Sequence, residues 1–274
     1  MCLSEVKYTR TYLPKDVVLN VKQNIMTRTL RVSLILIAAV LLCATGSLAQ
    51  KTYVVAVGLN NYDNGENPLP SSVGDARAIS HFFNDYNDSE VFMLKDQNAT
   101  RDHIMRVLKS HFSKSTEADE IIFAYSGHGF DGGISCYDTS NVIFCSEIQE
   151  ILRNAKARRK IMFINSCHSG SFSKKYDNDP RSRGYKSDKS NVMLYFSSRA
   201  DELSWESSLM SKSFFFNRLI QGLKGAADAN SDRKVTAREL FNYVNRNVIA
   251  DTEGAQHPQM YGKFPDDMVV VYVK

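Results

Sequence analysis

Two short stretches contain side chains that could act together as nucleophile and base. Cys167 follows the apolar run of IMFINSCHSG at 161–170, and His128 follows the run of IIFAYSGHG at 121–129. Both reactive side chains come directly after what the pattern predicts to be a buried strand. A cysteine thiolate attacks carbonyl carbon, and a neighbouring histidine can take its proton. The pair predicts acyl chemistry through a covalent intermediate; the alternative is a buried structural cysteine and a histidine in a loop.

Apolar runs around these stretches predict alternating strands and helices. Buried strands are expected at 53–58, 90–94, 120–125, 160–165, 191–197 and 268–273. Helices are expected at 73–86, after Thr100 as the capping residue, and at 146–157, 214–223 and 236–249, with a short hairpin after the Gly132-Gly133 turn. This order predicts an α/β fold: a three-layer α/β/α sandwich with a mostly parallel six-stranded sheet. In such a sheet the ends of neighbouring strands form the crevice that binds ligands, so Cys167 and His128 are expected to lie close together.

Residues 26–49 have the three parts of a secretory signal peptide. Arg28 and Arg31 precede an apolar run at 32–43, and the segment ends in small residues at Ser47-Leu48-Ala49. The apolar run is short for a membrane span. The sequence therefore predicts an exported bacterial protein, periplasmic or secreted, with no stable membrane span after the signal is removed.

Residues 1–25 are then expected to be an upstream extension before Met26, and 50–274 the functional domain; the alternative is a genuine tail with an uncleaved anchor. The whole chain has a net charge of +4, but without residues 1–49 it has 28 basic and 28 acidic residues. A balanced charge gives no argument for a nucleic-acid partner.

Three cysteines remain in the expected domain: Cys136, Cys145 and Cys167. An odd number in an exported chain indicates one disulfide and one free thiol. Cys136 and Cys145 flank the expected hairpin and could pair, leaving Cys167 free. The alternative is that they are two ordinary buried cysteines.

The motifs YSGHG at 125–129 and NSCHSG at 165–170 resemble those of the caspase-like clan of cysteine peptidases, most closely the metacaspases and bacterial orthocaspases. The likeness covers 51–273 and includes VAVGLNNY in the first expected strand and GDARAI at 74–79. The resemblance implies a caspase-like cysteine endopeptidase that acts on proteins or peptides.

In this family mechanism Cys167 attacks the scissile carbonyl as a thiolate and forms a thioester. His128 is the base and later protonates the leaving amine. The backbone N–H groups of Gly129 and Cys167 would hold the oxyanion. His168 is a rival base, but it is adjacent to Cys167 in the sequence and is expected to point away from the thiol.

One residue departs from the family pattern at the expected substrate site. Metacaspases have Asp two residues before the cysteine, where this chain has Asn165, and a neutral amide forms no salt bridge with Arg or Lys. The second family carboxylate matches Asp75, which could alternatively be only a helix cap or a dipole partner. Ser126 completes the candidate substrate-binding set. We expect a weakened preference for cleavage after Arg or Lys; the exposed loop at 171–190, with six basic residues, is either a self-cleavage site or simply a solvated loop.

The segment DANSDRKVTARE at 228–239 has the spacing of an EF-hand calcium loop. The expected Ca²⁺ ligands are Asp228, Asn230, Asp232, the backbone carbonyl of Lys234, and Glu239. Arg233 occupies the position where such loops have glycine. The alternative is a capped helix start without metal. Two rival functions stay open at this point: a catalytically silent, calcium-dependent binding module, and a related Cys-His transpeptidase or amidase of the legumain kind.

Overall fold

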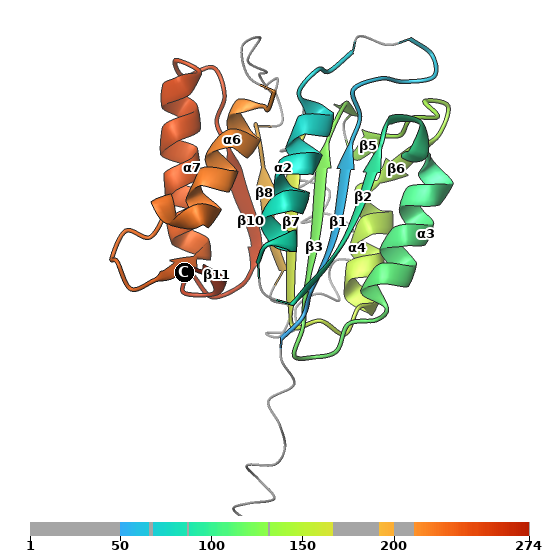
Figure 1. The fold of residues 1–274 in the computed structure, drawn as a ribbon. Coiled ribbons are helices and arrows are strands. Elements are labelled where there is room, and N and C mark those ends of the chain that lie inside the picture. Colours follow the sequence, from blue (N-terminus) through green and yellow to red (C-terminus); the bar gives the residue numbers. More distant parts are fainter. Residues whose placement is uncertain are drawn as a thin grey trace, which may run out of the picture. The chain divides into compact units, whose positions relative to one another are not determined.

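Runs rich in Val, Ile and Phe form the centre of the computed structural model (Figure 1). The structure describes residues 50–65, 68–86, 88–130, 132–166, 192–199 and 211–273. Six strands form one sheet in the order β10-β8-β7-β3-β1-β2. Their bounds are β1 Thr52–Gly58, β2 Ser89–Lys95, β3 Glu120–Ser126, β7 Arg159–Asn165, β8 Val192–Phe196 and β10 Gln259–Lys263. All neighbours pair in parallel except β10, which is antiparallel to β8.

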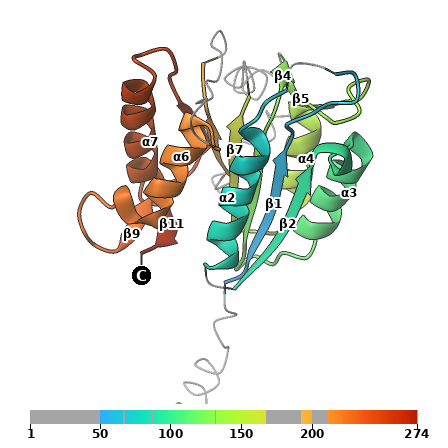
Figure 2. The ribbon, with the colours of Figure 1, turned by 45° about the horizontal axis from the view of Figure 1, so that its top comes forward.

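Helices cover both faces of this sheet (Figures 1 and 2). One face carries α2 Ser72–Asn84, α6 Phe214–Gln221 and α7 Ala237–Asp251, and the other carries α3 Arg101–Phe112 and α4 Cys145–Asn154. A 3-10 turn, η1 Asp96–Asn98, precedes α3, and a π turn, η3 Gly222–Ala226, extends α6. The predicted three-layer α/β/α sandwich with a mostly parallel six-stranded sheet is confirmed.

The alternation of side chains along β1 divides the core into two halves. Val55 packs with α3 residues such as Ile104, whereas Val54 packs with α2 residues such as Ile79. All four of these side chains are fully buried, two on each face of the sheet, which is why the strands are apolar on both faces. Each such side chain contributes about 1.5–3 kcal/mol to the free energy of folding.

The last predicted strand does not join the central sheet. β11 Val269–Tyr272 pairs antiparallel with β9 Lys234–Thr236 in a separate two-stranded sheet. The sixth strand of the central sheet is instead β10, whose sequence QMYGK is only half-buried or exposed. This edge strand has no continuous apolar run, so the pattern used to find buried strands did not reveal it.

A small antiparallel sheet follows β3. It consists of β4 Gly129–Phe130, β5 Gly133–Ser135 and β6 Val142–Phe144, and the predicted hairpin after Gly132-Gly133 is confirmed as β5 and β6. Across the described ranges, no helix combines the length and the apolar character needed to cross a bilayer.

Candidate active site

The segments that lead to His128 and Cys167 lie side by side at the carboxyl edge of the sheet. Ser126, the last residue of β3, is the register partner of Asn165, the last residue of β7. Beyond the strand ends, the Gly127 N–H donates a hydrogen bond of 3.1 Å to the Asn165 carbonyl. His128 therefore follows directly from a backbone contact with the strand that continues toward Cys167. Cys167 itself, and with it the rival base His168, lies outside the described residues.

Several contacts fix the main chain of His128 on both sides. Its N–H donates to the Tyr62 hydroxyl at 2.6 Å. Its carbonyl oxygen accepts from the Ser135 N–H at 3.0 Å and lies 2.7 Å from the Tyr125 hydroxyl, which also lies 2.9 Å from the Ser135 carbonyl. The ring of Tyr62 lies against the imidazole, with centroids 4.9 Å apart and an angle of 33° between the planes. The candidate base is thus fixed from two sides, by the β4–β5 hairpin and by the segment after β1.

Gly127 lets these hydroxyl groups approach. A Cβ atom at this position would meet the Tyr125 hydroxyl at 2.5 Å and the Tyr62 hydroxyl at 2.9 Å. A glycine is needed at this position because any larger side chain would take the space of these two hydroxyls. Gly129, the predicted oxyanion donor, begins β4 and pairs with Ile134.

The three predicted substrate-binding residues meet around the carboxylate of Asp75, which is fully buried. Its Oδ2 accepts from the Ser126 hydroxyl at 2.8 Å and from the Asn165 amide at 3.2 Å. Its Oδ1 accepts from the Ser213 N–H at 2.9 Å, from the segment before α6. Burial raises the pKa of Asp75 to about 7, although the hydrogen bonds from Ser213, Ser126 and Asn165 oppose this shift.

These contacts exclude the helix cap, which was one part of the alternative role for Asp75. The helix begins after Ser71, and the Asp75 carboxylate bonds to other elements, so Asp75 is not the cap of α2. It does stand in the first turn, where a negative charge is favoured by the helix dipole. Asn165 donates through its amide to Asp75 and, at 3.2 Å, to Ser126. Its carbonyl oxygen Oδ1 is buried and accepts no hydrogen bond within the described part of the chain.

The predicted calcium loop adopts a tight turn built from its own side chains. Asp228 accepts from the N–H groups of Asp232 and Arg233 at 3.2 and 3.0 Å. Asn230 also accepts from the Asp232 N–H, at 2.9 Å, and Asp232 accepts from the Lys234 N–H at 2.9 Å. Arg233 adopts a φ of 65°, the backbone conformation that glycine supplies in calcium loops. The fold of the loop thus agrees with the spacing that suggested it.

Glu239 has a structural role in the same segment. It accepts from the Thr236 N–H and hydroxyl at 3.0 and 2.8 Å, and from the Ala229 N–H at 3.3 Å. With the return bond from the Glu239 N–H to the Thr236 hydroxyl, this is a capping box at the start of α7. The start of α7 is therefore capped by side chains of the loop itself. Among the described residues, no group of three or more His, Cys, Asp or Glu side chains is arranged to hold a metal, and calcium binding stays a prediction.

Cys136 and Cys145 are both buried and have free thiols. The Cys145 thiol donates to the Gly132 carbonyl at 2.9 Å. Burial raises the pKa of the Cys136 thiol to about 12, so this group does not ionise near neutral pH. Of the two alternatives for this pair, the ordinary buried cysteines are confirmed.

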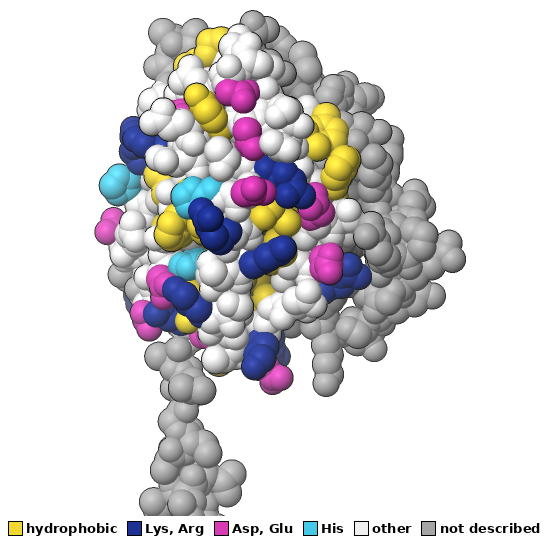
Figure 3. Space-filling view, turned by 90° about the vertical axis from the view of Figure 1, so that its right-hand side faces the viewer, with side chains coloured by type: hydrophobic (Ala, Val, Ile, Leu, Met, Phe, Trp, Pro, Cys, Tyr) yellow, Lys and Arg dark blue, Asp and Glu magenta, His cyan; other side chains and the backbone are white. Residues whose placement is uncertain are grey.

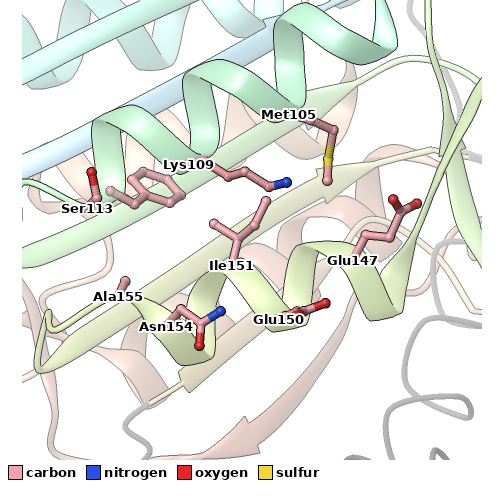
Figure 4. Close-up of a pocket in the computed structure, with 9 residues that line it drawn as sticks. Met105, Lys109, Ser113, Glu147, Glu150, Ile151, Asn154 and Ala155 are labelled. Carbon is pink, nitrogen blue, oxygen red and sulfur yellow. The ribbon is translucent and has the colours of Figure 1, made fainter.

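A hollow of about 340 Å³ lies away from these residues, between α3 and α4 (Figure 4). Lys109 extends from α3 across Ile151 of α4, with Glu147 and Glu150 on the opposite wall. None of the predicted site residues lines it. On the described part of the side formed by α3, basic and acidic side chains are interspersed (Figure 3).

The α/β/α fold, with the histidine and cysteine motifs following adjacent strands, is the arrangement of the caspase-like family of cysteine peptidases. The chain belongs to this family: the model of the caspase domain matches residues 51–269. A solved structure with a similar fold is protein GSU0716 from Geobacter sulfurreducens, with a TM-score of 0.58 and 16% identity over 79% of this chain and 95% of that chain. A search of curated proteins gave no match.

Proposed function

We propose that the protein is an active cysteine endopeptidase in which Cys167 is the nucleophile and His128 the base. The parallel register of β3 and β7, with Ser126 opposite Asn165, carries this proposal. Asn165 ends β7 at this edge and precedes Cys167 by two residues, a length of chain that spans at most about 7 Å. His128 begins its loop from the same edge, held to β7 by the Gly127 hydrogen bond.

The reaction follows from these two groups. His128 takes the thiol proton, the sulfur of Cys167 attacks the carbonyl carbon, and the amine leaves with the proton that His128 returns. Water then hydrolyses the thioester by the same base. The N–H groups of Gly129 and Cys167 would stabilise the oxyanion, and loss of one such donor costs about 3 kcal/mol in other enzymes.

The substrate site is proposed at Asp75, Ser126 and Asn165, with cleavage after Arg or Lys as in metacaspases. Asp75 supplies a single carboxylate, and the amide oxygen of Asn165 is a buried acceptor that a guanidinium or ammonium could satisfy. Three donors already bond to the Asp75 carboxylate, two on Oδ2 and one on Oδ1, which leaves room for about one further hydrogen bond from a substrate cation. Asn165 stands where the family has Asp, two residues before the cysteine, so it removes one charge from the site and weakens the preference for basic residues.

The direct test is labelling with a peptide chloromethyl ketone that ends in arginine, followed by peptide mass spectrometry. We expect the label on Cys167 alone, with loss of peptidase activity in the labelled protein and in Cys167→Ala. Cys136 and Cys145 are internal controls, because both are buried in the folded chain. Absence of label on Cys167 in folded protein, or full activity of Cys167→Ala, would refute the proposal. Product analysis with an added amine would separate hydrolysis from transpeptidation.

Calcium binding at 228–239 is a separate proposal, supported by the loop conformation and the φ of Arg233. We expect calcium to raise the melting temperature of the wild type and of Thr236→Ala, which keeps all carboxylates, but not of Asp228→Asn. A melting temperature that does not respond to calcium in any of the three would refute it.

Export, with removal of residues 1–49, and self-cleavage within 171–190 are proposed from the sequence. Both stretches lie outside the described residues. N-terminal sequencing of the secreted chain and of its fragments tests both proposals.

A further inference from the structure

We propose that Tyr62 is the positioning residue for the His128 imidazole, and that it orients the ring through contacts other than the hydrogen bond to an imidazole nitrogen that a third side chain makes in other cysteine and serine peptidases. The inference rests on the proposed function, since it assigns a partner to the proposed base. Two contacts of Tyr62 carry it: the hydroxyl that accepts from the His128 N–H, and the ring that lies against the imidazole.

These two contacts fix different parts of His128. The hydrogen bond of 2.6 Å fixes the peptide unit before the histidine. The ring contact, with centroids 4.9 Å apart, limits the side-chain torsions that the imidazole can adopt. The hydroxyl and the ring of Tyr62 belong to one rigid phenol group, so the hydrogen bond at the hydroxyl also helps to orient the ring. The tilt of 33° places the contact on the face of the imidazole, whereas protons are transferred through nitrogens at its edge.

Tyr62 can orient another residue because its own position is well determined. Its side chain is buried. On one side, the Asn61 N–H donates to the Asp96 carboxylate at 3.0 Å, and on the other the Asp63 N–H donates to the Tyr137 carbonyl at 3.1 Å. Asp96, whose carboxylate accepts this bond, has a φ of 43°, a left-handed conformation that non-glycine residues seldom adopt. The loop around Tyr62 is therefore fixed to η1 and to the segment after β5.

The test uses Tyr62→Phe and Tyr62→Leu, with Tyr53→Leu as the matched control. Tyr53 is also buried and its ring contacts a histidine, His111, with centroids 5.4 Å apart, but that pair lies between β1 and α3. We expect Tyr62→Leu to lower kcat by about tenfold to a hundredfold with KM within about twofold, because misplacing a catalytic group by about 1 Å costs up to about a hundredfold. Tyr62→Phe keeps the ring and should lose less. Tyr53→Leu should lower the melting temperature while kcat stays unchanged.

A second measurement needs no substrate. In the Cys167→Ala background, the ring-proton NMR resonances of His128 should move when Tyr62 is replaced by Leu, because the ring current of the tyrosine is lost, and should move less for Phe. A kcat of Tyr62→Leu equal to that of the wild type, or His128 resonances that stay in place, would overturn the proposal. If the wild type has no peptidase activity, the proposed function fails, and the resonances still decide whether Tyr62 orients His128.

Discussion

Selectivity for basic substrates should depend on the protonation of Asp75. Burial raises the pKa of this carboxyl to about 7, so it is about 90% ionised at pH 8 and about 10% ionised at pH 6. Only the ionised form attracts a substrate cation, and kcat/KM reports the free enzyme. We therefore expect the selectivity for arginine to fall by about tenfold between pH 8 and pH 6.

The assay compares two peptides that differ only in arginine or norleucine before the scissile bond. The ratio of their kcat/KM values cancels the titration of Cys167 and His128, because both substrates require the same dyad. Asp75→Asn is the control: its ratio should be low and independent of pH. A ratio that stays constant from pH 6 to pH 8 with Asp75 intact would show that this carboxylate does not bind the substrate cation.

Four further changes test the packing and electrostatics. Burial raises the pKa of Glu120 from 4.5 to about 7, although the nearby Arg159 opposes this shift. The free energy of unfolding should therefore fall as the pH rises from about 4.5 to 7. In urea unfolding, Glu120→Gln should remove up to about 3 kcal/mol of that fall. Glu90 has the opposite effect on the pH dependence of stability: hydrogen bonding from Lys114 lowers its pKa, so its charged form stabilises the fold and this contribution is lost as the pH falls. Glu90→Gln should remove that loss of stability at low pH. Gly58→Ala should cost about 1–3 kcal/mol, because the added Cβ would meet the Ser72 carbonyl at 2.4 Å. Gly127→Ala should lower kcat clearly while the melting temperature changes little, because the new methyl group displaces the hydroxyls that hold His128.

The central strands were predictable because burial on both faces leaves a local signature. In β1 and β3 every residue is buried, and each appears in the sequence as an unbroken apolar run. β10 is only partly buried, and its pairing with β8 depends on a partner more than 60 residues away. No local pattern in QMYGK records that pairing, so tertiary structure alone reveals it.

The candidate site shows the same division. Asp75, Ser126 and Asn165 were selected through the family resemblance, and the structure brings them within hydrogen-bonding distance of one another. Tyr62 was missed, although it ends the VAVGLNNY stretch that supported the resemblance. A tyrosine after a strand is typical of core packing, and nothing in its sequence neighbourhood indicates a contact with a residue 66 positions later.

The hydrogen bond from the Ser213 N–H to Asp75 joins residues separated by 138 positions. A growing polypeptide cannot form it until the segment before α6 has been synthesised and has left the ribosome. Contacts of such long range close late, because the loop between them loses entropy before any favourable contact compensates. A truncated chain that ends before α6 can have both peptidase motifs and still lack a finished substrate site, so roughly the last quarter of the chain decides when the molecule is complete.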